Sequence, residues 1–263
     1  MIAADLALAL DPVVLAERVG ISPDPWQAEV LRSASVRMLL NACRQSGKST
    51  TVALLNVHTA LYQPGSLCLM LSPSLRQSGE LFKKAAGIYR DLRRPVPADS
   101  ETALTLALEN GSRIVSLPGQ DATVRGYSGV RLLSIDEASR VPDELYHAVR
   151  PMLAVSRGRL VALSTPWGQR GWWHAAWTSD ELWERYAVPA THCPRISPEF
   201  LAEERRSMGA WWFEQEYRCV FKDAQDAVFR AEDIRAAFTD DVAPLFPAPE
   251  RHDPWPSTLT RSA

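Results

Sequence analysis

The residues best suited to chemistry form a Gly-Lys-Ser loop at residues 42–50, with the sequence ACRQSGKST. An apolar run typical of a buried strand precedes the loop, and a helical pattern follows it. A phosphate-binding loop requires this context, because the loop N–H groups and the helix N-terminus together attract anions. In such a loop Lys48 reaches the β- and γ-phosphates of ATP, and the Ser49 hydroxyl coordinates Mg²⁺. Ala42 replaces the usual first glycine, so the strict pattern is missed at one position.

The other polar positions of the same loop are expected to line the nucleotide. They are Gln45, Ser46, Gly47 and Thr50. Their backbone N–H groups supply the cradle that holds phosphate oxygens in loops of this kind.

Two adjacent acids, Asp136 and Glu137, follow the apolar run 132–135. At the end of a strand, Asp136 would hold the Mg²⁺ shell, and Glu137 would orient and deprotonate an attacking water. Such a pair alone is a weak signal, but about ninety residues after a phosphate loop it is a strong one. A glutamate at this position favours hydrolysis over transfer to a small acceptor.

A third polar element, Ser164-Thr165-Pro166, ends the next apolar run. Polar side chains at that position can sense hydrolysis beside the γ-phosphate. A plain turn in which proline stops the strand explains the same residues, and the spacing leaves both interpretations open.

The elements around these residues alternate between strand and helix. Apolar runs predict strands over 36–42, 66–72, 131–135 and 159–164, and helical periodicity is found over 48–62 and 73–92. Asn110-Gly111 predicts a hairpin between residues 104–108 and 113–117. The alternation predicts an α/β fold with a mainly parallel central sheet flanked by helices, and ligands at the carboxyl ends of its strands.

Composition excludes several classes of protein. The 263 residues carry 29 basic and 31 acidic side chains, a formal charge of −2, so no global basic field attracts nucleic acid. The sequence contains no run of about 18 consecutive apolar residues, the length that would indicate a membrane span. The four cysteines show no CxxC pair, which argues against a zinc site and fits a reducing compartment.

Taken together, the segments RQSGKST, VRGYSG, SIDEA and STP resemble the ATPase domain of the large terminase subunit of tailed bacteriophages. The segment PDPWQ at residues 23–27 is similar to the part of the family that recognises adenine, and WFEQEY at 212–217 to the stretch that closes the ATPase domain. The resemblance covers residues 1–240. It implies a P-loop NTPase of the RecA-like (ASCE) type with a small lid subdomain, using ATP and Mg²⁺.

The resemblance also implies roles for four residues. Arg44 corresponds to a loop arginine that acts on the γ-phosphate in cis, and Arg125 to an arginine that reaches the ATP of a neighbouring subunit. Gln27 corresponds to the adenine contact and Thr165 to the motif that couples hydrolysis to motion. Either arginine could instead form a structural ion pair or contact DNA.

The implied function is ATP hydrolysis that drives double-stranded DNA into a phage procapsid. The implied partners are double-stranded DNA, the portal protein, the small terminase subunit and further copies of the chain in a ring on the portal. The implied location is the cytoplasm of the infected or lysogenic bacterium, without secretion or membrane insertion.

The expected organisation is an N-terminal helix (residues 1–20), an ATPase core (21–190), a helical lid or linker (191–240) and a Pro-rich tail (241–263). Terminases of this type normally continue into a metal-dependent nuclease domain. No apolar strands follow Phe229 to carry its acidic cluster, so we expect the nuclease to be absent, and the unrelated final residues favour truncation.

Two alternatives remain open at this point. A fragment of a superfamily-2-type helicase also couples a phosphate loop to an Asp-Glu pair, although no room is left after residue 240 for its second RecA-like domain. A catalytically idle remnant that only binds DNA or the portal is the other alternative. The joint presence of Lys48, Ser49, Asp136 and Glu137 argues against it.

Overall fold

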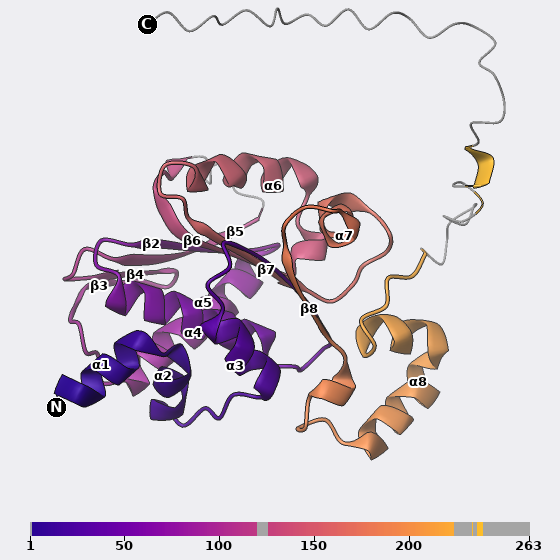
Figure 1. Cartoon of the computed structure of the whole chain (residues 1–263), viewed down its shortest axis with the longest axis horizontal. Coiled ribbons are helices and arrows are strands. Elements are labelled where there is room, and N and C mark those ends of the chain that lie inside the picture. Colours follow the sequence, from indigo (N-terminus) through magenta and orange to yellow (C-terminus); the bar gives the residue numbers. More distant parts are fainter. Residues whose placement is uncertain (1, 120–125, 224–232, 234–235, 239–263) are drawn as a thin grey trace, which may run out of the picture. The chain divides into compact units, whose positions relative to one another are not determined.

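An eight-stranded sheet forms the centre of the computed structural model, which describes residues 2–119, 126–223, 233 and 236–238 (Figure 1). The strand order is β3-β4-β5-β2-β6-β7-β1-β8. The strands are β1 (Arg37–Ala42), β2 (Leu67–Ser72), β3 (Ala98–Glu101), β4 (Thr105–Leu108), β5 (Arg113–Pro118), β6 (Val130–Asp136), β7 (Arg159–Ser164) and β8 (Glu184–Val188). From β5 to β8 all neighbours are parallel, and the pairings β3–β4 and β4–β5 at the other edge are antiparallel. The predicted α/β fold with a mainly parallel sheet is confirmed.

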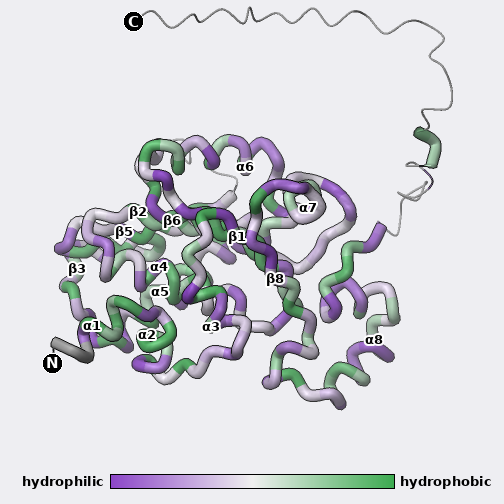
Figure 2. The backbone as a smooth tube through the Cα atoms, viewed as in Figure 1, coloured by the Kyte–Doolittle hydropathy of each residue, from purple (hydrophilic) through white to green (hydrophobic). Residues whose placement is uncertain are grey.

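Helices cover both faces of this sheet (Figure 1). The helices of the first face are α1 (Ile2–Leu10), α2 (Pro12–Arg18), α3 (Pro25–Arg32), α4 (Lys48–Tyr62) and α5 (Leu75–Asp91). The helices of the second face are α6 (Asp143–Val149) and α7 (Gly171–Thr178). The last helical segment, α8 (Pro198–Glu216), follows β8 and is interrupted by a kink at Gly209, where φ is 79° and ψ is 162°. It carries both hydrophilic and hydrophobic residues along its length (Figure 2).

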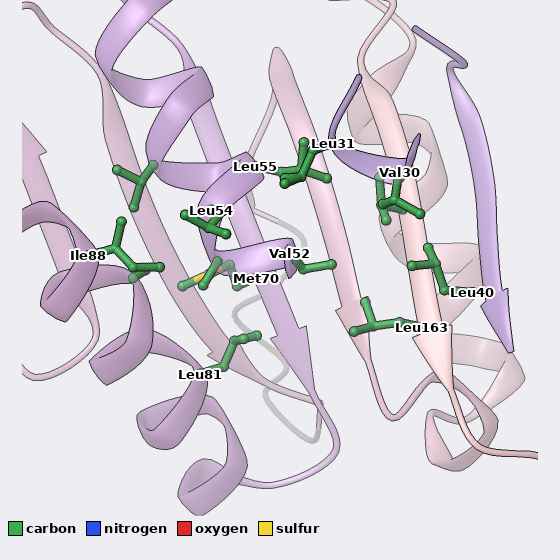
Figure 3. Close-up of a cluster of buried hydrophobic side chains, with 14 of the residues drawn as sticks. Val30, Leu31, Leu40, Val52, Leu54, Leu55, Met70, Leu81, Ile88 and Leu163 are labelled. Atoms are coloured by element: carbon green, nitrogen blue, oxygen red, sulfur yellow. The ribbon is translucent and has the colours of Figure 1, made fainter. Parts of the chain in front are cut away.

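The larger hydrophobic core lies between the sheet and the first set of helices. Helix α4 is central to it, because Val52, Leu54 and Leu55 are almost completely buried there (Figure 3). Strand residues such as Leu40 and Leu163 meet them from the sheet side (Figure 3). Burial of several such side chains, each worth about 1.5–3 kcal/mol, fixes α4 and the loop that precedes it.

Most predicted elements are found with small shifts at their ends, and the predicted helix over residues 48–62 coincides with α4. The single N-terminal helix is wrong: the structure has α1 and α2, separated at Asp11. The Asp11 carboxylate accepts a hydrogen bond from the Val13 N–H (2.9 Å), and Pro12 occupies the first turn of α2, so a new helix begins there.

Two edge strands, β3 and β8, are not predicted from the sequence. Strand β8 lies beside β1, which carries the phosphate loop, with Met38 opposite Glu184 and Ala42 opposite Val188. The residues of β8 are mostly half-exposed, so its sequence lacks the continuous apolar character of the inner strands.

The chain divides into two compact units, Met1–Ala224 and Gln225–Ala263. The sheet and all the helices named above belong to the first unit. The predicted Pro-rich tail (241–263) lies outside the described residues, and the lid boundaries and the absence of a nuclease domain stay predictions. Among the described residues, no helix combines the length and apolar character needed to span a membrane.

Candidate functional site

Three strand ends bring the predicted functional segments together. Strand β7 lies between β1 and β6, and all three are parallel. Asn41 is opposite Ser164, and Leu163 is opposite Asp136, so the three strands end at the same level. The carboxyl ends of these strands therefore bring together the phosphate loop, the Ser-Thr-Pro segment and the two acids. Ligands bind at this position in open α/β folds.

The phosphate loop turns sharply into α4. Gly47 adopts a left-handed conformation with φ 91°, and Gln45 is left-handed with φ 59°. The N–H groups of Thr50 and Thr51 donate to the Gly47 carbonyl oxygen, which starts the helix at Lys48. The N-terminus of α4 thus carries a partial positive charge at the loop, which favours an anion there.

Lys48, Ser49, Asp136 and Glu137 form one cluster. The Ser49 hydroxyl donates to Asp136 Oδ2 (2.9 Å), and Lys48 Nζ lies 3.6 Å from Glu137 Oε1. Burial raises the pKa of the Asp136 carboxyl and the charge of Glu137 adds to this, whereas Lys48 and the Ser49 hydrogen bond oppose it. The four residues that the sequence singles out for phosphate, metal and water chemistry are thus in mutual contact.

The backbone at Glu137 is unusual for a side-chain-bearing residue. Its φ and ψ are 50° and 44°, in the left-handed region, which costs about 1–2 kcal/mol outside glycine. The Glu137 N–H donates to Asp136 Oδ1 (3.0 Å). Backbone strain of this kind is common at functional sites.

The Ser-Thr-Pro segment is tied to the loop that follows the two acids. The Ser139 N–H donates to Ser164 Oγ (3.2 Å), and the two hydroxyl oxygens lie 2.7 Å apart. Thr165 is buried beside them. Further along the two loops, the Arg140 guanidinium lies 3.8 Å from the centre of the Trp167 ring. These contacts link the two loops to each other.

Arg195, which the sequence analysis does not identify, holds the phosphate loop from outside. Its Nη2 donates to the Ser46 carbonyl oxygen (2.9 Å), and its Nη1 donates to Asp24 Oδ1 (2.8 Å). The Ser46 hydroxyl oxygen is buried and has no hydrogen-bond partner among the described residues. No local motif marks Arg195, because its partners lie 149 and 171 positions away in the chain.

Gln27 lies against the same loop. Its Oε1 accepts from the Asp24 N–H (2.8 Å), and its Nε2 donates to the Thr51 hydroxyl (3.0 Å). Both polar side-chain atoms are therefore engaged within the protein. The predicted contact of Gln27 with adenine stays a prediction.

Arg44 forms an ion pair with a residue at the end of α8. Its Nε lies 2.6 Å from Glu216 Oε2, and the Arg44 N–H donates to the Glu216 carbonyl oxygen (3.2 Å). The Arg44 side chain is 61% exposed, whereas that of Glu216 is 8% exposed. The structural ion pair left open by the sequence is present, and action of Arg44 on the γ-phosphate stays a prediction. Arg125 lies outside the described residues.

The residues present fit a nucleotide with Mg²⁺. A hydroxyl and a carboxylate, Ser49 and Asp136, meet beside the N-terminus of a helix. Mg²⁺ binds oxygen ligands and usually keeps several waters, so one or two protein ligands and the phosphates suffice. Within the described ranges, no three His, Cys, Asp or Glu side chains converge on a point, so no all-protein metal cage is present there.

Comparison with known families finds one match, described as the terminase large subunit, T4likevirus-type, N-terminal, over residues 39–236. The chain belongs to this family. The terminase fold is also found in the large terminase ATPase domain of Thermus phage P74-26, with 20% identity and a TM-score of 0.70 over 79% of this chain and 97% of that one. No curated protein matches the chain in sequence.

Two longer terminases show the same fold at lower identity. The large terminase of a thermophilic bacteriophage, in complex with ADP, has 12% identity and a TM-score of 0.61 over 76% of this chain and 54% of its own. The bacteriophage HK97 large terminase has 15% identity and a TM-score of 0.60 over 74% and 50%. This chain therefore spans about half the length of these two proteins.

Family membership confirms the predicted resemblance and the RecA-like ATPase fold. It also supports the predicted role in ATP-driven DNA packaging, and the helicase and idle-remnant alternatives are not favoured.

Proposed function

We propose that this chain is the Mg²⁺-dependent ATPase motor of a phage DNA-packaging terminase, and that it hydrolyses ATP to move double-stranded DNA into a procapsid. The observation that supports this most strongly is the contact between the phosphate loop and the two acids, Ser49 to Asp136 at 2.9 Å and Lys48 to Glu137 at 3.6 Å. Nucleotide binding is further supported by the thermophilic bacteriophage terminase, whose structures include complexes with ADP and ATP-γ-S.

Binding of ATP would rearrange the pair formed by Lys48 and Glu137. The loop N–H groups of residues 45–50 and the start of α4 hold the phosphates, and Lys48 turns from Glu137 toward the β- and γ-phosphates. Ser49 and Asp136 would hold Mg²⁺, which neutralises phosphate charge when bound. Gln27 lies close enough to the loop to contribute to adenine binding after a rotation of its amide.

Glu137 is the proposed general base. Once Lys48 turns to the phosphates, the Glu137 carboxylate is free to accept a proton from the attacking water. The left-handed backbone at Glu137 sets the direction of its side chain before substrate binds. Removal of a general base typically costs about 10²–10⁴ in rate.

The proposed transition-state contacts are two arginines. Arg44 would exchange Glu216 for the γ-phosphate, and Arg125 would reach the ATP of the next subunit in a ring. An arginine supplied in this way is worth about 10³–10⁵ in rate. Thr165, on the loop bonded to the segment after Glu137, would transmit hydrolysis toward the lid at residues 191–240.

The partners proposed for this motor are double-stranded DNA, the portal protein and the small terminase subunit. A homo-oligomeric ring on the portal, in the cytoplasm of the bacterial host, is the proposed setting. Family membership supports these proposals.

The decisive experiment measures steady-state ATP hydrolysis and ATP binding for the wild type, Glu137→Gln and the control Glu144→Gln, with and without Mg²⁺ and double-stranded DNA. Glu144 is exposed in the first turn of α6 and matches the substitution chemically. We expect Glu137→Gln to bind ATP normally and to lose at least about a hundredfold in turnover. Equal turnover in both variants, or turnover without Mg²⁺, would refute the assignment.

A further inference from the structure

A cavity of about 630 Å³ lies at the amino-terminal ends of the strands, opposite the phosphate loop. It is lined by residues before or at the start of β1, β6 and β7, by the second half of α4, and by the α1–α2 junction and the end of α3. Helix α4 leads from the phosphate loop to this cavity, and its lining residues Leu55, His58 and Thr59 lie about 10–17 Å along the helix from Lys48 at 1.5 Å per residue. The two sites are therefore separate.

Four arginines converge on this cavity from three segments of the chain. They are Arg32, Arg131, Arg157 and Arg159. One acid, Asp11, also lines it and is held by Arg32 at 2.7 Å. Among the described residues that line the cavity, three guanidinium groups therefore remain without a carboxylate.

The partners of these three arginines do not neutralise them. Arg131 Nε donates to the neutral Gln63 side chain (2.7 Å). Among the described residues, no acid lies within ion-pair distance of Arg157 or Arg159. Arg157 is exposed and has a left-handed backbone with φ 49°. It lines the cavity and lies two residues before Arg159 in the chain.

Arg159 is the least satisfied of the four. Its Nε and Nη2 atoms are buried and have no hydrogen-bond partner among the described residues. Burial lowers the pKa of its guanidinium, and the charge of Glu184 opposes this. The Glu184 carboxylate, however, already accepts hydrogen bonds from the hydroxyls of Ser33 and Tyr186. A half-buried guanidinium without a partner is costly, so a bound anion would relieve it.

We propose that this cavity binds a small phosphate-bearing anion through Arg131, Arg157 and Arg159. Guanidinium groups match phosphate oxygens with paired hydrogen bonds, and three cations suit a multiply charged anion. A small anion can enter the cavity and approach Arg159, whereas the backbone of a DNA duplex passing over the surface would meet mainly the exposed Arg157. The proposal does not depend on the ATPase function.

The test uses pyrophosphate as the probe and Lys48→Ala as the background, because that substitution weakens phosphate binding at the loop and Lys48 does not line the cavity. Calorimetric titration at constant ionic strength compares this background alone with the same background carrying Arg159→Met, Arg157→Ala or Arg113→Ala. Arg113 is exposed at the start of β5. It therefore lies at the amino-terminal ends of the strands, as the cavity does, but does not line the cavity.

We expect one pyrophosphate per chain in the Lys48→Ala background, and at least a tenfold loss of affinity, about 1.4 kcal/mol, on adding Arg159→Met. Arg157→Ala should also weaken binding, and Arg113→Ala should not. Because Arg157 is exposed, Arg157→Ala should fold normally. It therefore tests the proposed anion binding even if Arg159→Met fails to fold. Equal affinities in all four proteins, or an equal loss with Arg113→Ala, would overturn the proposal. Loss of binding to a short DNA duplex without any pyrophosphate binding would overturn it in favour of a DNA contact.

Discussion

Alanine in place of Gly47 would put a Cβ atom into space that the phosphate loop shares with two side chains. That Cβ would lie 2.7 Å from Gln27 Nε2 and 3.3 Å from Arg195 Nη2. The Gln27 amide cannot withdraw without loss, because it accepts from the Asp24 N–H and donates to the Thr51 hydroxyl. We therefore expect Gly47→Ala to destabilise the fold as well as to weaken nucleotide binding.

The size of the effect follows from two contributions. Gly47 has φ 91°, and a residue with a Cβ in the left-handed region costs about 1–2 kcal/mol. Displacing Gln27 breaks at least one buried hydrogen bond, worth about 1 kcal/mol. The free energy of unfolding should therefore fall by about 2–3 kcal/mol.

Urea unfolding of the wild type, Gly47→Ala, Gln27→Ala and the double variant measures the two contributions separately. Gln27→Ala removes the atom that the new Cβ would meet, so the double variant should lose about 1 kcal/mol less than the sum of the single variants. Gly87→Ala is the matched control. Gly87 lies inside α5 with nothing within 4 Å of an added Cβ, so alanine there should stabilise the protein by about 0.5–1 kcal/mol.

Two results would refute this reasoning. If the losses of Gly47→Ala and Gln27→Ala add to within about 0.5 kcal/mol, the Cβ does not displace Gln27. If Gly47→Ala behaves like Gly87→Ala, the left-handed backbone at the loop is wrong.

Two further predictions concern the amino-terminal ends of the strands, opposite the phosphate loop. Burial lowers the pKa of His58 below its usual 6.5, so the unfolded chain takes up the proton first, and the free energy of unfolding should fall as the pH drops below about 6.5. His58→Gln should lose less stability than the wild type between pH 7 and pH 5 in urea titrations; equal losses would contradict this. Alanine at Gly158 would lie 2.0 Å from the Val130 carbonyl oxygen and 2.7 Å from Leu153 Cδ2, so Gly158→Ala should cost about 3 kcal/mol. An unchanged melting temperature would show that the turn between these residues has room for a side chain.

The local sequence is sufficient to predict those parts of the site whose residues are adjacent in the chain. The apolar run before Arg44 and the helical pattern after Gly47 predict the phosphate loop, because strand, loop and helix are contiguous. Likewise, Asp136 and Glu137 follow a buried strand whose apolar composition is clear in the sequence. The phosphate loop and the two acids lie close together because the carboxyl ends of parallel strands lie on the same side of the sheet.

The residues that hold the site from outside could not be predicted in this way. Arg195 and Glu216 are separated from the loop by about 150 and 170 positions. Arg195 lies in no motif, and the WFEQEY segment that contains Glu216 does not reveal its partner. Strand β8 is half-exposed and short, so its pattern resembles that of a loop. The pairing of Arg44 with Glu216, rather than with a phosphate, depends on how the end of α8 returns to the loop, which is a tertiary effect.

The distant partners of the phosphate loop have a consequence for folding during synthesis on the ribosome. Asn41 donates to the Cys219 carbonyl oxygen across 178 positions, and Arg44 pairs with Glu216 across 172. At about 5–20 residues per second, helices α1–α7 and the inner strands emerge before these partners do. Contacts between residues so far apart form late and slowly. The nucleotide site is therefore the last part of the domain to be completed, and a nascent chain that stalls before residue 195 carries the phosphate loop without the side chains that hold it in place.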